Sequence, residues 1–184
     1  FFWADSSGTA NANARNSAID CQYCSGSLKL RNNIMYNWQN AINLDNTFAT
    51  SPNYQLHNNT IVDSRGTGIL LSLFKATDTL RMKNNLVKGS TTADIGISSS
   101  ASTSESANNC TSDATSPDGA SYQSRTFTFV NAASQDFHLS GSDTGAVDKR
   151  ADLSADANYP FSDDIDGQTR VVTWDAGADD LAAT

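Results

Sequence analysis

Hydrophobic and polar positions alternate along residues 17–111 in a pattern that repeats about every 25 residues. Each copy contains a pair of asparagines, and the second one falls at Asn33, Asn59, Asn85 and Asn109, with spacings of 26, 26 and 24 residues. Between these pairs lie apolar residues separated by one position: Ile19 and Cys21, Ile42 and Leu44, Ile69 and Leu71, and Ile95 and Ile97. A period of two is typical of β-strands, and a regular repeat of this length is typical of a solenoid.

The residues around these positions decide between two classes of solenoid. A leucine-rich repeat has a similar period, but it needs a Leu-rich framework with a helical or extended return arm. Here the surrounding residues are mostly Asn, Thr, Ser and Gly, which are poor helix formers and favour turns. The pattern therefore predicts an all-β fold, a short parallel β-helix of about four coils over residues 17–115.

A solenoid of this length makes a short stack. At a strand spacing of about 4.8 Å, the coils would rise only about 15–20 Å. Each coil buries its core only against its neighbours, so such a stack gains little stability by itself. We therefore expect a longer parent protein, a homo-oligomer such as a trimer, or a larger assembly.

Two sets of motifs resemble a known group of proteins. The copies at 28–34, 54–60 and 80–86, each with Asn-Asn at its fifth and sixth positions, resemble the right-handed parallel β-helix repeats of the pectate-lyase-like superfamily. The segments 129–139, 164–170 and 174–179 resemble the closing segment of secreted bacterial and phage-encoded β-helix proteins, although 142–148 departs from the usual Gly-Ser-Pro-Ala-Ile-Asp. The resemblance implies an extracellular, cell-surface or virion-surface location. It implies no single function, because the superfamily includes polysaccharide lyases, glycoside hydrolases, adhesins and virion proteins.

The chain divides into three parts. Residues 1–16 begin with three aromatic residues, and we expect them to cap the open end of the solenoid or to pack on a neighbouring chain. Residues 17–140 form the β-helix. Residues 141–184 are acidic and show little periodicity, so we expect an irregular segment that closes the other end.

Composition and charge narrow the classes of partner. At 184 residues one domain is expected, and we read the chain as a mature form or a fragment because it begins without Met and has no recognisable signal peptide. No apolar run approaches the length of a membrane span. The net charge is -8, and residues 136–184 hold 11 of the 20 acidic residues but only 3 of the 12 basic ones. Nucleic-acid binding is disfavoured, since it needs a basic surface.

Three cysteines leave at least one thiol unpaired. Cys21 and Cys24 have CxxC spacing, but a zinc site would need two more ligands. Cys21 and Cys110 both occupy apolar positions of the repeat, so we favour buried core cysteines over metal binding or catalysis. A disulfide between Cys21 and Cys24 remains open and would suit an oxidising compartment.

The asparagine column at Asn33, Asn59, Asn85 and Asn109 has a structural and a chemical interpretation. Stacked side-chain amides can hydrogen-bond from coil to coil. Asn58-Asn59-Thr60 and Asn109-Cys110-Thr111 also fit the glycosylation sequon. We favour the structural ladder.

A basic face is the main candidate binding site. With the apolar residues of each strand facing inward, alternation directs six polar residues outward on one sheet: Lys29, Arg31, Gln55, His57, Arg81 and Lys83. Such a grid suits the carboxylate or sulfate groups of an acidic polysaccharide, or a protein partner.

The same face has two other interpretations. Uronate lyases need a cation at the carboxylate and a base beside it, and Arg81, Lys83 and His57 supply these residue types. Against catalysis, the chain shows no compact Asp cluster like the Ca²⁺ site of pectate-type lyases, and a flat sheet face is a poor pocket. The interpretation we favour is that this face carries charge for solubility, or packs against the acidic C-terminal segment or a subunit.

Two sets of carboxylates complete the candidates. Asp164 and Asp166 form an Asp-x-Asp-Gly turn of the kind that can bind Ca²⁺, although a plain Asp/Gly turn tied to Arg170 is the simpler explanation. A glycosidase would need two carboxylates on neighbouring coils. Asp20, Asp45 and Asp94 qualify by repeat position, but the third coil has no counterpart.

Taken together, the sequence favours a non-enzymatic structural or adhesive module of an extracellular or virion surface, which decorates or stabilises an assembly or adheres to glycans. The alternative is a fragment of a polysaccharide lyase or glycoside hydrolase that acts on an acidic polysaccharide. We expect no required cofactor, with Ca²⁺ as the only candidate ion, and no convincing catalytic set.

Overall fold

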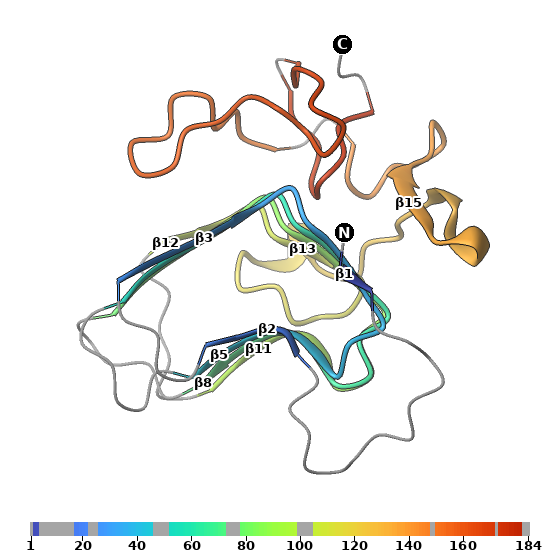
Figure 1. Cartoon of the computed structure of the whole chain (residues 1–184). Coiled ribbons are helices and arrows are strands. Elements are labelled where there is room, and N and C mark those ends of the chain that lie inside the picture. Colours follow the sequence, from blue (N-terminus) through green and yellow to red (C-terminus); the bar gives the residue numbers. More distant parts are fainter. Residues whose placement is uncertain are drawn as a thin grey trace.

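Four coils of three strands each stack into a parallel β-helix, as the repeat predicts (Figure 1). The computed structural model describes residues 2–3, 17–21, 26–45, 52–72, 78–98, 105–147, 150–171 and 173–181. Each coil contributes one strand to each of three sheets, which are described below in the order first, second and third; along the chain a coil passes through the second, then the third, then the first sheet.

The strands of each sheet run parallel to one another. In spatial order the first sheet contains β1 (Phe2–Trp3), β4 (Ile34–Tyr36), β7 (Thr60–Val62), β10 (Leu86–Lys88) and β13 (Cys110–Thr111). The second sheet contains β11 (Ala93–Ile97), β8 (Thr67–Ser72), β5 (Asn40–Asp45) and β2 (Ser17–Cys21). The third sheet contains β12 (Glu105–Ala107), β9 (Thr79–Lys83), β6 (Asn53–His57) and β3 (Ser27–Arg31).

The register of the sheets reproduces the period read from the sequence. In the first sheet Ile34 pairs with Thr60, Thr60 with Leu86, and Leu86 with Cys110. The apolar pairs of the second sheet align in the same way, since Ile42 pairs with Ile69 and Leu44 with Leu71. The predicted ladders are therefore real columns of the solenoid.

The two asparagines of each pair have different tasks at the corner between the third and first sheets. The first one, at Asn32, Asn58, Asn84 and Asn108, adopts a left-handed backbone conformation with φ between 49° and 60°. Asparagine tolerates this conformation better than most residues because its short polar side chain can bond locally. The backbone conformation of the corner thus favours Asn at the first position.

The second asparagine of each pair forms a continuous ladder inside the corner. Asn33 Nδ2 donates to Asn59 Oδ1 at 3.0 Å, Asn59 to Asn85 at 2.9 Å, and Asn85 to Asn109 at 2.7 Å. Asn109 Nδ2 then donates to Asp118 Oδ2 at 2.8 Å, so a carboxylate ends the ladder. The side chains also bond the backbone of the neighbouring coil, which satisfies their buried amides.

The inward side chains of the three sheets form the main core. The predicted columns contribute most of it, including fully buried Ile42, Leu44, Leu56 and Ile69. Tyr54 also lies in this core, and its burial raises the pKa of its hydroxyl to about 12. Removing these side chains from water is the principal stabilising contribution of the solenoid.

After β13 the chain crosses the end of the last coil, where Asp113, Thr115 and Asp118 accept the backbone N–H groups of Asp94, Ile95 and Asn109. The C-terminal region then folds back over the outside of the stack (Figure 1). It contains two 3₁₀ turns, η1 (Ala120–Tyr122) and η2 (Ala132–Ser134), and an antiparallel pair, β14 (Phe129–Asn131) and β15 (Asp136–Leu139). The outward residues of the first sheet pack against this region in a second core. Its buried members are Ile34, Val62, Leu86, Cys110, Phe127, Phe129, Phe137, Leu139, Ala146, Ala176 and Ala178.

Sequence expectations for the N-terminus and the cysteines have mixed outcomes. Of the proposed capping segment 1–16, only β1 is described, and it adds a fifth strand beside β4; the rest lies outside the described residues. Cys21 is buried and disulfide-bonded, and Cys110 is a buried free thiol. Cys24 of the open Cys21–Cys24 prediction lies outside the described residues. Among the residues placed by the structure, no helix has the length and apolar character needed to cross a membrane.

Candidate functional site

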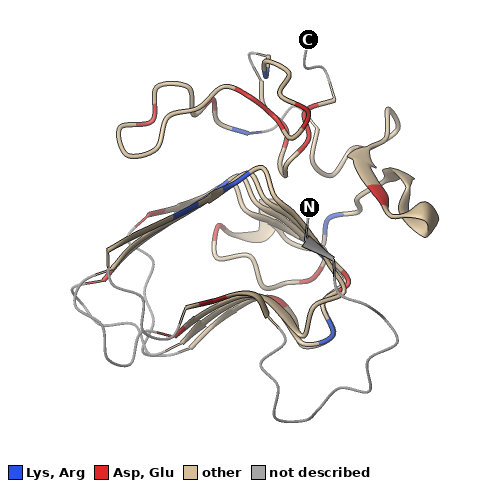
Figure 2. Ribbon diagram, in the orientation of Figure 1, with Lys and Arg blue, Asp and Glu red and all other residues tan. Residues whose placement is uncertain are grey.

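The predicted basic face exists, but the chain's own C-terminal segment covers part of it and leaves Lys29 exposed. Lys29, Gln55 and Arg81 align across the third sheet, and Arg31, His57 and Lys83 form the adjacent row. Residues 150–171 pass over this face, and Figure 2 shows their acidic positions above the basic ones. Gln55 is 1% exposed, His57 0% and Lys83 9%. The buried part of the face therefore packs against the acidic C-terminal segment, which is one of the interpretations favoured from the sequence.

Ion pairs between the sheet and the covering segment explain this arrangement. Lys83 Nζ lies 2.7 Å from Asp156 Oδ2 and 2.6 Å from Glu105 Oε1 of the neighbouring strand. Burial raises the pKa of Asp156, but the Lys83 hydrogen bond and two backbone N–H groups outweigh it and bring the value to about 2. Arg31 pairs with Asp163 at 3.0 Å at the more exposed end of the face. The acidic excess of the C-terminal region is thus matched to the basic grid.

An aromatic pair completes the cover. The ring of Tyr159 lies 5.6 Å from the ring of His57, and that of Phe161 lies 6.3 Å away. The same two rings also contact cations of the sheet: Lys29 Nζ lies 4.8 Å from the Tyr159 centroid, and the Arg31 guanidinium lies 4.9 Å from the Phe161 centroid. Cation–π contacts of this kind favour a charged sheet face beneath an aromatic cover.

His57 lies beneath this cover without a hydrogen bond to either ring nitrogen. Its burial lowers its pKa from 6.5 to about 4, and the attraction of Asp156 offsets only part of that effect. Because the unfolded chain accepts a proton near pH 6.5 and the folded chain resists it until about pH 4, acid favours unfolding across this interval. His57 therefore makes the folded state sensitive to mild acid.

Substitution of His57 by Phe is expected to remove this sensitivity. The shift corresponds to a loss of about 2 kcal/mol of unfolding free energy between pH 7 and pH 5 in the wild type. The aromatic substitute keeps the contacts with Tyr159 and Phe161. Urea unfolding at both pH values measures the difference, and an equal pH dependence in the two proteins would show that His57 is not its source.

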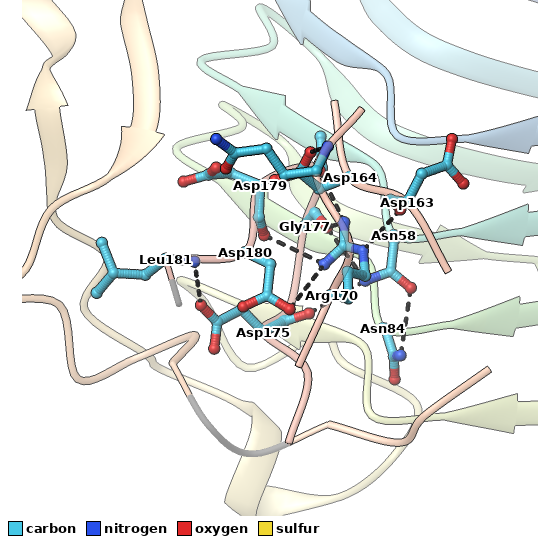
Figure 3. Close-up of polar contacts among 12 residues, drawn as sticks. Asn58, Asn84, Asp163, Asp164, Arg170, Asp175, Gly177, Asp179, Asp180 and Leu181 are labelled. Atoms are coloured by element: carbon cyan, nitrogen blue, oxygen red, sulfur yellow. Dashed lines mark hydrogen bonds and ion pairs between the residues drawn. The ribbon is translucent and has the colours of Figure 1, made fainter. Parts of the chain in front are cut away.

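Arg170 is the central contact between the C-terminal end and the solenoid corner (Figure 3). Its guanidinium donates to Asn32 Oδ1 at 3.1 Å and to the backbone oxygens of Gly177 at 3.1 Å and Ala178 at 2.7 Å. It also lies 5.2 Å from the centroid of the Trp174 ring. The side chain is fully buried, so these contacts replace its hydration.

Asn58 and Asn84, the first asparagines of their pairs, also bond the C-terminal end of the described chain. Asn58 Nδ2 donates to the backbone oxygens of Asp175 and Gly177, both at 3.1 Å. Gly177 in turn donates its N–H to the Asn84 carbonyl at 2.8 Å, with φ at 97°. A Cβ at Gly177 would lie 2.5 Å from Thr60 Oγ1, so only glycine permits this close approach.

Asp164 and Asp166, the predicted Ca²⁺ pair, lie in one turn, but their carboxylates make different contacts. Asp164 Oδ1 accepts the N–H groups of Asp166 and Gln168, both at 2.9 Å, which is the plain Asp/Gly turn. Asp164 is 3% exposed, and its Oδ2 has no hydrogen-bond donor. Asp166 instead points its carboxylate toward His138, with Oδ2 3.2 Å from Nε2.

His138 lies between carboxylates at the edge of a cavity. Its Nδ1 lies 2.6 Å from Asp136 Oδ1, and this hydrogen bond raises the pKa of His138 and lowers that of Asp136. The cavity has a volume of about 330 Å³ and is lined by Ile34, Ser134, Gln135, Asp136, Phe137, His138, Ile165 and Asp166. A concave site with converging polar groups and perturbed pKa values is a candidate binding site.

A third acidic residue joins this cluster. Asp179 is 8% exposed, and its Oδ2 accepts the Leu139 N–H at 2.7 Å. Burial raises its pKa, and repulsion by Asp164 and Asp166 acts in the same direction. One ligand atom each from His138, Asp166 and Asp179 lies within 4.8 Å of the others. Within the described ranges, this group has the composition of a metal site.

No family model, curated protein or solved structure matches this chain. The functional interpretation therefore rests on the geometry of the C-terminal region and the third sheet.

The glycosidase candidates have structural roles where the structure describes their contacts. Asp94 is buried and accepts hydrogen bonds from the backbone of Ser90 and Asp113 and from both Ser112 groups. Asp20 is exposed and accepts from Asn43 Nδ2 at 3.1 Å. Neither arrangement resembles an acid and base facing a common substrate.

Sequence reasoning missed the cluster around His138. Its members lie on β15, in the turn around 163–169 and near the C-terminus, so no regular spacing relates them. The available signal was the resemblance of 129–139, 164–170 and 174–179 to a closing segment, because these three stretches contain or adjoin the cluster.

Proposed function

We propose that this chain is a non-enzymatic structural and adhesive β-helix module of an extracellular or virion surface. The observation that carries the proposal is the internal use of the groups that a lyase would need. Lys83 is held by two carboxylates, Arg81 lies 3.3 Å from Glu105, and His57 is sealed beneath aromatic rings. A catalytic group must touch its substrate, and these groups hold a scaffold together instead.

The fold supports the same proposal. Three parallel sheets, with an asparagine ladder that joins successive coils, are consistent with a right-handed solenoid related to the pectate-lyase-like superfamily. The C-terminal segment closes one side of this scaffold with a second core. We propose that the scaffold assembles into a trimer or a larger structure, since its stack of coils is short and each coil buries its core only against its neighbours.

The cavity beside β15 is the proposed adhesive site. Its volume of about 330 Å³ is at the small end of ligand pockets and suits a single sugar unit. Asp136, Asp166 and Gln135 offer acceptors for sugar hydroxyl groups, while Ile34 and Ile165 provide apolar backing. Glycan adhesion at this position does not require the covered basic face.

One purified preparation can test this proposal against the alternative of a lyase or glycosidase fragment. We expect no unsaturated uronate or reducing-sugar product from alginate, pectate or chondroitin, and a native mass by light scattering of a trimer or larger. Product that Arg81→Gln abolishes and Lys88→Gln leaves unchanged would contradict the non-enzymatic assignment. A monodisperse monomer would contradict the assembly role.

A further inference from the structure

Three separate stretches of the C-terminal region converge on one point. His138 lies on β15, Asp166 lies in the following turn region, and Asp179 lies near the end of the described chain. Each supplies a ligand atom within 4.8 Å of the other two. We infer that His138, Asp166 and Asp179 bind one divalent transition-metal ion, such as Zn²⁺ or Mn²⁺.

The donor set selects the class of ion. One imidazole nitrogen with two carboxylates suits Zn²⁺ or Mn²⁺, whereas Ca²⁺ prefers six to eight oxygen ligands. At metal–ligand distances of about 2.1 Å, tetrahedral ligands lie about 3.4 Å apart, so small side-chain movements would complete the site. This site differs from a calcium turn made by Asp164 and Asp166.

Neighbouring groups orient the ligands. Asp136 Oδ1 holds His138 Nδ1 at 2.6 Å, which leaves Nε2 facing Asp166 Oδ2 at 3.2 Å. A carboxylate on the far nitrogen is the usual partner of a metal-binding histidine. The Leu139 N–H fixes Asp179 through Oδ2 in the same way. The fold therefore holds two of the three ligands, His138 and Asp179, in place.

The local electrostatics favours a cation. Two carboxylates meet at this point, and Asp164 adds a third nearby whose Oδ2 is buried without a donor. Carboxylates this close together repel one another. A bound dication would offset this repulsion, beyond what Arg170 supplies to the same group of acids.

The cavity provides the remaining coordination positions. Both His138 and Asp166 line it, so water or a sugar hydroxyl can reach the ion from that side. Three protein ligands with an open position are typical of accessible metal sites. The ion would also join β15 to the turn and to the C-terminal end, and so stabilise the folded C-terminal region.

Titration calorimetry of the tag-free, EDTA-treated and dialysed chain tests the inference with ZnCl₂, MnCl₂ and CaCl₂. We expect one ion per chain, with Zn²⁺ or Mn²⁺ bound at least about tenfold more tightly than Ca²⁺. His138→Gln and Asp166→Asn should each weaken binding at least about tenfold, and Asp136→Asn should do so through the orientation of His138. Asp152→Asn removes the same charge from an exposed position and should bind as the wild type does.

Thermal unfolding in the same buffers provides an independent readout. The ion should raise the melting temperature of the wild type and of Asp152→Asn, but not that of Asp166→Asn. Circular dichroism of each variant checks that it is folded. Absence of saturable 1:1 binding up to about 1 mM Zn²⁺ and Mn²⁺, or equal affinity in wild type and Asp166→Asn, would overturn the inference.

Discussion

Replacement of Arg170 by Met is expected to lower the free energy of unfolding by about 3–5 kcal/mol, the range found when one partner of a buried ionic network is removed. The guanidinium bonds Asn32, Gly177 and Ala178 from a fully buried position. Its loss would remove these bonds and the one to the Asp179 carbonyl at 3.3 Å, although the Gly177 and Ala178 carbonyls would keep the Asn58 side chain and the Ile165 N–H as donors. It would also leave the neighbouring carboxylates of Asp175, Asp179 and Asp180 without their cation.

Arg31→Met is the matched control for this substitution. Arg31 also pairs with an acidic residue of the C-terminal segment, Asp163, but both side chains are partly exposed to water. Exposed pairs contribute about 0–1 kcal/mol, so the control should remain close to the wild type. Chemical unfolding followed by tryptophan fluorescence compares the two variants. Equal destabilisation by both would show that Arg170 is not the central contact.

Replacement of Asn85 by Ala should cost about 3 kcal/mol, because each buried group left without a partner costs about 1–3 kcal/mol. Asn85 Nδ2 donates to Leu56 O and to Asn109 Oδ1, both at 2.7 Å. Its Oδ1 accepts the backbone and side-chain N–H groups of Asn59 at 3.1 and 2.9 Å. The substitution therefore interrupts the ladder in its middle and removes one hydrogen-bond partner each from Asn59, Leu56 and Asn109.

Asn43→Ala provides the comparison for the ladder. Asn43 also stacks on a neighbouring coil, but its side chain bonds Asp20 at an exposed position. Urea unfolding of the two variants should give a clearly larger loss for Asn85→Ala. A difference below about 1 kcal/mol would mean that water replaces the ladder bonds easily.

The solenoid was predictable because its determinants are periodic. The asparagine column and the alternating apolar residues each recur once per coil, so the sequence spacing gives the neighbours of each residue in the stack. Ile42, Ile69 and Leu71 lie in the core as expected. Two details escaped the pattern. Ile97 is 38% exposed, whereas Ile95 on the same edge strand β11 is buried. The column of Ile34, Leu86 and Cys110 is buried against the C-terminal region rather than inside the coils.

The candidate sites were less predictable because they depend on single long-range contacts. Arg31 and Asp163 are 132 residues apart, and no spacing in the sequence relates them. The uneven charge distribution suggested that the acidic tail could face the basic grid, and the structure places it there. The approach of His138 to Asp166 and Asp179 depends on the course of irregular turns, which neither periodicity nor composition determines.

The ladder ends on a carboxylate, Asp118, instead of another asparagine, and this gives the stack a direction. An asparagine passes the bond onward because it both accepts and donates, whereas a carboxylate only accepts. The coil that carries Asn109 is therefore a chemical terminus of the column. Additional repeats inserted ahead of this coil would extend the column with the same bonds, while a repeat added beyond Asp118 would find no amide to continue it. Repeat duplication can therefore lengthen the ladder in one direction only, with the coil of Asn109 kept as the last one.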